Sequence, residues 1–250
     1  MRDIELSRTS NVRDLGGYGA VPWRRLYRGG GLHRLAGDDL GVIRALGLRT
    51  VLDLRTVREL EKHGTCPLAA DVVNLPMIPG KWDMTGLSEA TVAEDYLLAR
   101  YIDMLATGAG AIATAFELLR DPARYPVMLF CAGGKDRTGV LAALLLATLG
   151  VDDATIAADY ALSEERTARM RASRPAPQET MLHLHPALFA APVPAMLRLL
   201  AHIRGEHGSI AGFLAGLGVS RAHQDELRVA ALASGRPLSI ARSAPGDHVS

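Results

Sequence analysis

One stretch of the chain joins a predicted buried strand to a predicted buried helix through a short loop of small and charged residues. Residues 127–130 form an apolar run of strand length, and residues 140–149 form an apolar segment that Gly150 ends. The loop between them carries Cys131 and, with five residues in between, Arg137. The backbone N–H groups of such a turn can point inward, and the following helix N-terminus adds partial positive charge. The stretch therefore predicts an anion-binding loop, selective for phosphate.

Each residue type in this loop suits reaction at a bound phosphoryl group. The field that binds an anion also stabilises a thiolate, so Cys131 is the predicted nucleophile. Arg137 offers a planar fork that can make two parallel hydrogen bonds to phosphoryl oxygens. Gly133 and Gly134 allow close approach of the backbone. Thr138 either caps the helix or donates a hydrogen bond to the sulfur.

The other loop residues complete the predicted phosphate-binding set. Ala132 contributes its backbone N–H, and Lys135 contributes an ammonium group. Lysine is rare here: the chain has 28 basic residues, of which Lys62, Lys81 and Lys135 are lysines, which leaves 25 arginines. Two interpretations of Lys135 stay open. It binds a second phosphate of the substrate, or it only balances the charge of Asp136.

The spacing of cysteine and arginine alone is a weak signal, because arginine is abundant. One alternative is a buried cysteine with no chemical role before an ordinary helix. The strand before the loop and the helix after it argue against this alternative. A nucleotide-binding loop of the Walker type is a further alternative. It is excluded because Lys135 is followed by Asp136 and not by the Ser or Thr that would bind magnesium.

This stretch resembles the signature of the cysteine-dependent phosphatases, specifically the bacterial tyrosine-phosphatase-like family with Cys-x-Ala-Gly-Lys-Asp-Arg-Thr-Gly. Residues 11–18, 26–29 and 50–55, together with Glu59, are similar to amino-terminal motifs of that family, so the resemblance spans most of residues 7–230. Two departures stand out. Phe130 replaces the usual His before the cysteine, and Gly133-Gly134 replaces the usual Ala-Gly pair.

The resemblance implies a fold and a reaction. The fold is the cysteine-phosphatase α/β fold, a central mostly parallel sheet flanked by helices. The reaction is phosphomonoester hydrolysis through a phosphocysteine, without metal or other cofactor. Implied substrates are phosphotyrosine proteins, with phosphoserine, phosphothreonine or phosphoinositides as further candidates. Because relatives with this Lys-Asp pair lack a separate acid loop, Asp136 is the expected general acid, with Asp53 and Asp14 in reserve and a purely structural Asp136 as the alternative.

Two other functions use the same residues. A sulfurtransferase-like enzyme also has a cysteine loop, but it does not need both Asp136 and the Arg137-Thr138 pair. A catalytically weak phosphate-binding module would be expected to lose Cys131 or Arg137, and both are present. The expectation is therefore a phosphatase.

Composition limits the remaining possibilities. With 250 residues, 48% of them hydrophobic, the chain suits one α/β domain over residues 1–233. A net charge of +1 predicts no nucleic-acid partner. No apolar leader or membrane-length run occurs, and only Cys66 accompanies Cys131, so we expect a cytoplasmic protein without membrane insertion. Export without a signal peptide and the oligomeric state stay open.

Residues outside the loop give weaker indications. Residues 7–20 suit a loop whose Asn11, Arg13 and Asp14 either border the site or only fix the loop locally. Residues 50–54 predict a central strand that brings Asp53 and Arg55 to the ligand crevice as substrate-binding residues, with an internal ion pair as an equal alternative. Residues 24–28 and 71–75 predict further strands, residues 29–31 a flexible glycine link, and residues 76–87 a loop beside the site.

Helices are predicted over residues 38–46, 57–62, 89–105, 109–119, 152–171, 194–204, 209–215 and 220–233. Prolines interrupt residues 172–192, which we interpret as an insertion or lid, and residues 234–250 have the composition of a disordered tail. His183, His185, His202 and His207 invite a metal site, but no carboxylate or thiolate accompanies them at ligand spacing, so none is predicted.

Overall fold

The computed structural model describes the chain except for residues 1, 81–86, 89, 173–184 and 234–250. A five-stranded sheet lies at its centre, in the order β1-β2-β5-β3-β4. The strands are β1 (Ser10–Asp14), β2 (Leu26–Gly30), β3 (Thr50–Asp53), β4 (Asp71–Asn74) and β5 (Val127–Cys131). All neighbouring pairs are parallel except β1 with β2. The predicted mostly parallel α/β sheet is therefore confirmed.

The central strand β5 separates two apolar layers because its side chains alternate between the faces of the sheet. Val127, Leu129 and Cys131 belong to the larger hydrophobic cluster, and Met128 and Phe130 belong to the smaller one. All five are buried, as expected for a strand covered on both faces. The nucleophile predicted at the end of this strand thus faces the larger helical layer.

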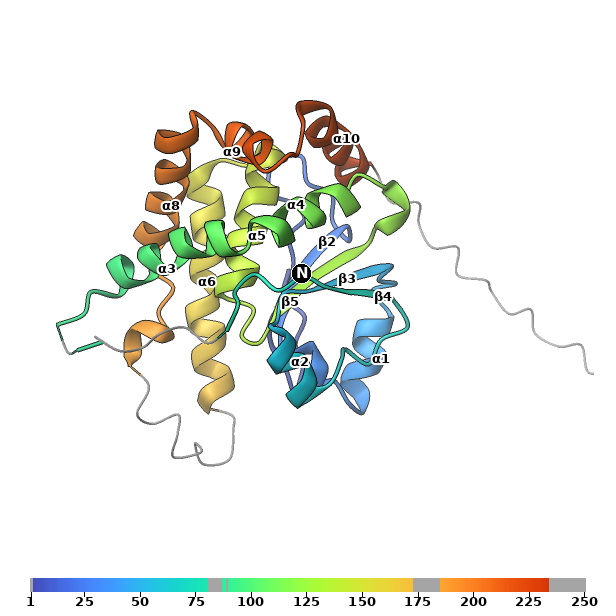
Figure 1. Cartoon of the computed structure of the whole chain (residues 1–250). Coiled ribbons are helices and arrows are strands. Elements are labelled where there is room, and N and C mark those ends of the chain that lie inside the picture. The colour runs from blue at the N-terminus through green and yellow to red at the C-terminus, as the bar shows by residue number, and fades with distance from the viewer. Residues whose placement is uncertain (1, 81–86, 89, 173–184, 234–250) are drawn as a thin grey trace, which may run out of the picture.

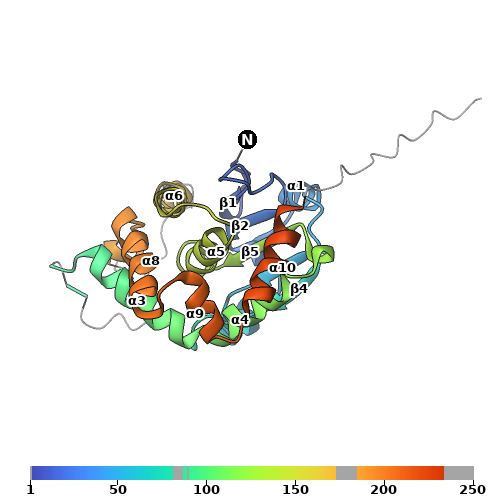
Figure 2. The ribbon, with the colours of Figure 1, turned by 90° about the horizontal axis from the view of Figure 1, so that it is seen from above.

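Helices cover both faces unequally. On one face lie α1 (Asp38–Arg44) and α2 (Val57–His63), below the sheet in Figure 1. The other face carries the larger layer. Viewed from above, its remaining helices surround α5 (Figure 2). Its helices are α3 (Ala93–Thr107), α4 (Ala109–Leu118), α5 (Asp136–Thr148), α6 (Asp153–Ala172), α8 (Val193–His207), α9 (Ile210–Gly216) and α10 (Arg221–Leu232). Three short 3₁₀ turns lie in the connections: η1 (Leu32–Arg34) between β2 and α1, η2 (Pro122–Arg124) between α4 and β5, and η3 (Pro186–Leu188) between α6 and α8.

Local sequence explains several helix ends. Thr56 accepts a hydrogen bond from the backbone N–H of Glu59, and the Glu59 side chain accepts one from the backbone N–H of Thr56, which is a complete capping box at the start of α2. Ser209 and Ser220 cap α9 and α10 through their hydroxyl groups, which accept hydrogen bonds from the backbone N–H groups of Gly212 and His223. Most predicted helices agree with the structure within a few residues, and the largest difference is α3, which begins at Ala93 and not at residue 89.

Two predictions about the amino-terminal segment were wrong. Residues 10–14 are not loop but the antiparallel edge strand β1, paired with β2 and irregular in register between Ser10 and Arg13. Residues 29 and 30 are not a flexible link, because Gly29 and Gly30 belong to β2 and pair with Phe130 and Cys131. The glycines favoured a link over a strand in the sequence, because glycine is rare inside strands unless another backbone lies close.

Some predictions fall outside the described residues. They concern most of the proposed lid at 172–192, the tail at 234–250, His183, and Lys81 in the loop 76–87. Of the lid, residues 185–192 are described and contain η3. No helix in the described ranges is both long and apolar enough to span a bilayer.

Candidate active site

The loop from Cys131 to Arg137 connects the end of β5 to the start of α5, as the sequence predicts. Cys131 is the last residue of β5 and is 2% exposed. Its Sγ accepts a hydrogen bond from the backbone N–H of Gly134 at 3.2 Å. Helix α5 begins at Asp136, so its free N–H groups and its dipole lie beside the sulfur. This geometry stabilises negative charge at the sulfur and at an anion held over it.

Two glycines, one in strand β2 and one in the loop, let the loop pack directly on the strand. A Cβ on Gly30 would overlap the backbone of Gly133, and a Cβ on Gly134 would overlap the backbone of Gly29. Gly134 also has φ +68°, in the left-handed region that favours glycine. A Cβ on Gly133 would meet nothing within 4 Å, and a Cβ on Gly29 would meet the side chain of Val12, so the close contacts between loop and strand require glycine at 30 and 134. The paired glycines of β2 and of the loop therefore fit each other.

Two buried side chains hold the outer side of the loop. Asn11 Nδ2 donates to the carbonyl oxygen of Gly134 at 2.8 Å, and Arg28 Nη2 donates to the same oxygen at 2.9 Å. Arg28 Nη2 also lies 3.3 Å from the carbonyl oxygen of Lys135. Asn11 has φ 62° at the irregularity of β1, which turns its side chain toward the loop. Because these carbonyl groups are bound from behind, the loop N–H groups remain available on the other side.

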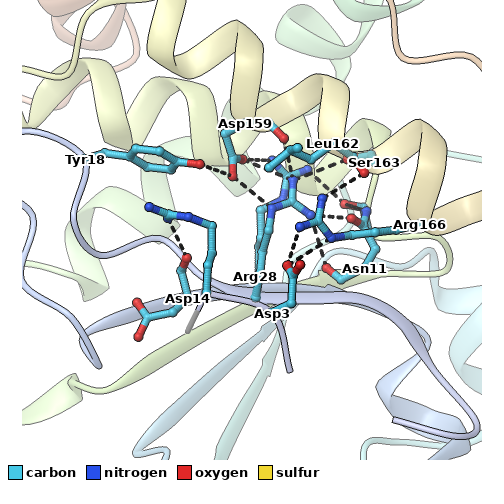
Figure 3. A network of polar contacts seen from close by, with 12 residues as sticks. Asp3, Asn11, Asp14, Tyr18, Arg28, Asp159, Leu162, Ser163 and Arg166 are labelled. Atoms are coloured by element: carbon cyan, nitrogen blue, oxygen red, sulfur yellow. Dashed lines mark hydrogen bonds and ion pairs between the residues drawn. The ribbon is translucent and has the colours of Figure 1, made fainter. Parts of the chain in front are cut away.

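Asp159 on α6 anchors this support. It accepts hydrogen bonds from Arg28 Nη1 at 2.7 Å and from Arg13 Nε at 2.9 Å. Figure 3 shows Asp159 above Arg28, with Tyr18 hydrogen-bonded to the same carboxylate. Burial raises the pKa of Asp159, but the charges of Arg13 and Arg28 outweigh it and hold that pKa well below its usual value. Burial and the charge of Arg28 lower the pKa of Arg13 to about 10, against the opposing charge of Asp159.

Arg137 is held in position by Glu59. Its Nη1 and Nη2 atoms lie 2.5 and 3.0 Å from the two carboxylate oxygens of Glu59, and Nη1 lies 3.4 Å from the carbonyl oxygen of Leu54. Burial lowers the pKa of Arg137, but the charges of Cys131 and Glu59 outweigh it and raise that pKa. Burial raises the pKa of Glu59, but Arg137 outweighs it and lowers that pKa to about 2. The arginine is thus charged and oriented before any ligand binds.

Asp136, the expected general acid, is held by two donors. Its Oδ1 accepts a hydrogen bond from the hydroxyl of Tyr101 at 2.7 Å and lies 2.9 Å from Nζ of Lys135. Lys135 is 4% exposed, and its Nζ also donates to the carbonyl oxygen of Ala190 at 2.7 Å. The structure thus brings Lys135 against Asp136, the arrangement in which Lys135 balances that charge. The Asp136 side chain remains 23% exposed.

Thr138 is fully buried in the first turn of α5. The N-cap position is Lys135 and has no side-chain hydrogen bond, so of the two alternatives for Thr138 the structure does not show the capping one. The hydroxyl of Thr138 has no hydrogen-bond partner among the described residues. It remains a candidate donor to the sulfur.

Asp53 and Arg55 form an internal ion pair. Both are 0% exposed, and Arg55 Nη2 lies 2.6 Å from Asp53 Oδ2. Arg55 also donates to the carbonyl oxygen of Gly64, and its guanidinium lies 5.2 Å from the ring centroid of Phe130. The structure agrees with the alternative interpretation, and it corrects the expectation that the two residues line an open crevice. Phe130 belongs to this opposite face of the sheet, away from the cluster that contains Cys131.

Asp14 and His185 have structural roles. The carboxylate of Asp14 accepts hydrogen bonds from the backbone N–H groups of Gly16 and Arg24, and so fixes the turn after β1. His185 accepts from the backbone N–H of Ala187 and lies 2.8 Å from the carbonyl oxygen of Ser88. In the part of the chain that the structure describes, no group of three potential metal ligands occurs.

The sequence interpretation missed the contact between Tyr101 and Tyr160. Both lie on helices at positions that periodicity assigns to the core, and both are buried. Their hydroxyl groups lie 2.6 Å apart. Nothing in the local sequence indicates that they meet beside Asp136, because residues 101, 136 and 160 come from α3, α5 and α6.

Comparison with known proteins gives concordant matches. The profile of the tyrosine phosphatase family matches residues 4–233. A Cupriavidus necator protein named "Putative tyrosine-protein phosphatase" is 32% identical over 188 residues, which cover 67% of this chain and 65% of that protein, just under two thirds of its length. "Triple specificity protein phosphatase PtpB" of Mycobacterium tuberculosis is 27% identical over 248 residues, covering 82% of this chain and 89% of that protein.

Among solved structures, Pseudomonas aeruginosa TpbA matches with 16% identity and a TM-score of 0.37, over 87% of this chain and 95% of that one. This score is too low to support an inference about the site. The family profile, in contrast, covers most of the sequence, including the segments that form the cysteine loop and its supports. The chain belongs to the tyrosine phosphatase family.

Proposed function

We propose that the protein hydrolyses phosphomonoesters, phosphotyrosine in proteins first among them, through a phosphocysteine formed on Cys131. The observation that carries this proposal is the cysteine at the centre of an anion-binding loop, with its Sγ 3.2 Å from the N–H of Gly134 and a positioned arginine beside it. In the first step the thiolate of Cys131 attacks phosphorus in line. The S–P bond forms as the bond to the leaving oxygen breaks.

The loop lowers the barrier by binding the charge that spreads over the equatorial oxygens. Its N–H groups and Arg137 are oriented in advance by Asn11, Arg28 and Glu59, so they need little rearrangement during the reaction. Asp136 gives its proton to the leaving oxygen. In the second step its carboxylate takes a proton from water, which attacks phosphorus and releases phosphate and the thiolate.

The supports of the loop favour a phosphatase over the two alternatives. A phosphate-binding module needs no general acid beside its phosphate-binding loop. In this protein, Tyr101 and Lys135 hold Asp136 at the loop. A sulfurtransferase-like enzyme likewise has no use for a proton donor at an ester oxygen. The chemistry of Asp136 therefore supports hydrolysis of an ester.

The range of substrates forms a second part of the proposal. We propose phosphoinositide head groups and phosphoserine or phosphothreonine as further substrates, and we note that the mycobacterial relative is named a triple specificity phosphatase. Nζ of Lys135 has three N–H bonds, and the contacts to Asp136 and Ala190 account for two. The third is the group that would bind a second phosphate.

Replacement of Cys131 with serine tests the reaction. We expect Cys131→Ser to abolish turnover of a phosphotyrosine peptide and to retain binding of tungstate, a phosphate analogue, because the backbone amides bind the anion. Steady-state kinetics measure the turnover, and isothermal titration calorimetry measures the binding.

Cys66→Ser is the matched control, since Cys66 is the other cysteine and is also buried. It should retain turnover. Residual activity of Cys131→Ser close to that of the unchanged protein would refute the proposal, as would an equal loss in folded Cys66→Ser.

A further inference from the structure

The carboxylate of Asp136 is held at one of its two oxygens. Within the described residues, the contacts to this group come from the hydroxyl of Tyr101 and the ammonium of Lys135, and both go to Oδ1. A general acid must present one oxygen to the substrate with its proton. If Oδ1 is occupied by two donors, Oδ2 is the oxygen that carries the proton.

The donor direction at Tyr101 follows from its surroundings. A hydroxyl group has one proton, and the contact of Tyr101 with a carboxylate oxygen requires that Tyr101 donates it there. The oxygen of Tyr101 then accepts the proton of Tyr160 across 2.6 Å. Burial, followed by the negative charge of Asp136, raises the pKa of Tyr101 well above its usual value. Tyr101 therefore remains protonated and stays a donor.

Packing fixes the two tyrosines. Tyr101 is 0% exposed and Tyr160 1% exposed, and their rings meet edge to face with centroids 6.0 Å apart. Gly139, one turn into α5, leaves room for Tyr160: a Cβ there would lie 3.1 Å from its ring. Glycine inside a helix is otherwise unfavourable. Its presence between the loop and Tyr160 is explained by this close approach.

Helix α6 links this pair to the support behind the loop. Asp159 binds Arg28, and Arg28 donates to the carbonyl oxygens of Gly134 and Lys135. Tyr160 directly follows Asp159 in the sequence. Figure 3 shows the Asp159 side of this arrangement, with Asp159 above Arg28. The same helix thus supports the phosphate-binding amides through Asp159 and contacts Tyr101 through Tyr160.

We propose that Tyr101, oriented by Tyr160, is a positioning residue that fixes Asp136 through Oδ1 and leaves Oδ2 to carry the proton. This inference rests on the proposed function. In the first step the Oδ2–H bond breaks, the proton moves to the leaving oxygen, and that oxygen keeps the electron pair of the broken P–O bond while S–P forms. In the second step Oδ2 takes a proton from the attacking water, the water oxygen bonds to phosphorus, and the S–P bond breaks to release phosphate and restore the thiolate.

The test compares leaving groups. Tyr101→Phe should lower kcat/KM by about tenfold for phenyl phosphate, whose leaving group needs a proton, as expected for one lost hydrogen bond to a charged group. For 4-nitrophenyl phosphate, whose leaving group departs as an anion, kcat/KM should change by less than about twofold. The parameter kcat/KM is chosen because it reports the step in which the acid acts.

Tyr125→Phe is the matched control. Tyr125 is also a buried tyrosine, and its hydroxyl donates to the carbonyl oxygen of Leu119, outside the site. It should leave both rates unchanged. Tyr160→Phe removes the second hydroxyl and should reduce the phenyl phosphate rate by a smaller factor than Tyr101→Phe.

Asp136→Asn separates the two levels of the proposal. If it lowers phenyl phosphate turnover by about 10²–10⁴-fold with a much smaller loss on the nitrophenyl ester, Asp136 is the acid. Equal losses of Tyr101→Phe on both substrates, or no loss on either, would then refute the role of Tyr101 alone. Equal losses of Asp136→Asn on both substrates would refute the acid assignment itself.

Discussion

Asp159 compensates the charges of two guanidinium groups that are almost fully buried, and its replacement with asparagine should therefore destabilise the protein strongly. Arg13, Arg28 and Asp159 have side-chain exposures of 0%, 1% and 1%. Asparagine keeps an acceptor oxygen but removes the negative charge. Breaking a buried ion pair by removing one partner costs about 3–5 kcal/mol, because the remaining charge stays buried without compensation.

The expected change is large enough to measure directly. In a domain of this size 1 kcal/mol corresponds to about 2–4 °C in melting temperature, so Asp159→Asn should melt about 6–20 °C lower. Differential scanning calorimetry and urea titration give the melting temperature and the free energy of unfolding. The loss should also weaken tungstate binding, since Arg28 would no longer be held against the carbonyl oxygens of the loop.

Glu165→Gln is a suitable control on the same helix. Glu165 pairs with Arg169 four residues later, but both side chains are 64% exposed. An exposed pair of this kind is screened by solvent and contributes little to stability. Similar small losses in both variants would refute the argument that burial makes the Asp159 cluster important.

The pH dependence gives a second check. The folded-state pKa of Asp159 is depressed below the unfolded value of about 3.9, so its contribution is complete above that range and is lost as the pH falls toward the folded-state pKa. The difference in unfolding free energy between the unchanged protein and Asp159→Asn should be constant from about pH 5 to 8 and should narrow below about pH 4. A gap that widens on acidification would contradict the assignment.

Two further predictions concern the loop. Glu59→Gln keeps an acceptor for the capping box but loses the charge that orients Arg137. The value of kcat/KM for a phosphotyrosine peptide should therefore fall by about tenfold or more. Unchanged kinetics would show that Arg137 is oriented without Glu59. Lys135→Ala, assayed on phosphotyrosine peptides and on phosphoinositides, should lower phosphoinositide turnover by the larger factor if the ammonium binds a second phosphate. Equal factors on both substrates would exclude that role of Lys135.

The cysteine loop could be predicted from the sequence because its determinants are local. A buried strand, small residues and a helix start are contiguous between residues 127 and 149, and backbone geometry then directs the amides of the turn. The α/β class was predictable for the same reason, since periodicity and breaker residues act over a few positions.

The partners of the loop depended on the tertiary structure. The sequence left open whether Asp53 and Arg55 line a crevice or pair internally. In the structure both are buried on the face opposite to Cys131, where they form an ion pair. The sequence interpretation took Gly29 and Gly30 for a link. The tertiary structure explains why a strand contains them, because the loop packs against Gly30 and Val12 of β1 packs against Gly29.

The contacts that connect distant segments were also beyond the sequence. Asn11, Arg28 and Asp159 are held to one another and to Gly134 across more than a hundred residues, and Tyr101 reaches Asp136 from another helix. A hydrogen bond depends on direction and on distances of a few tenths of an ångström. Such geometry arises only when β1, β2, α3, α5 and α6 pack together, so the sequence determined the reactive loop and the packing determined what orients it.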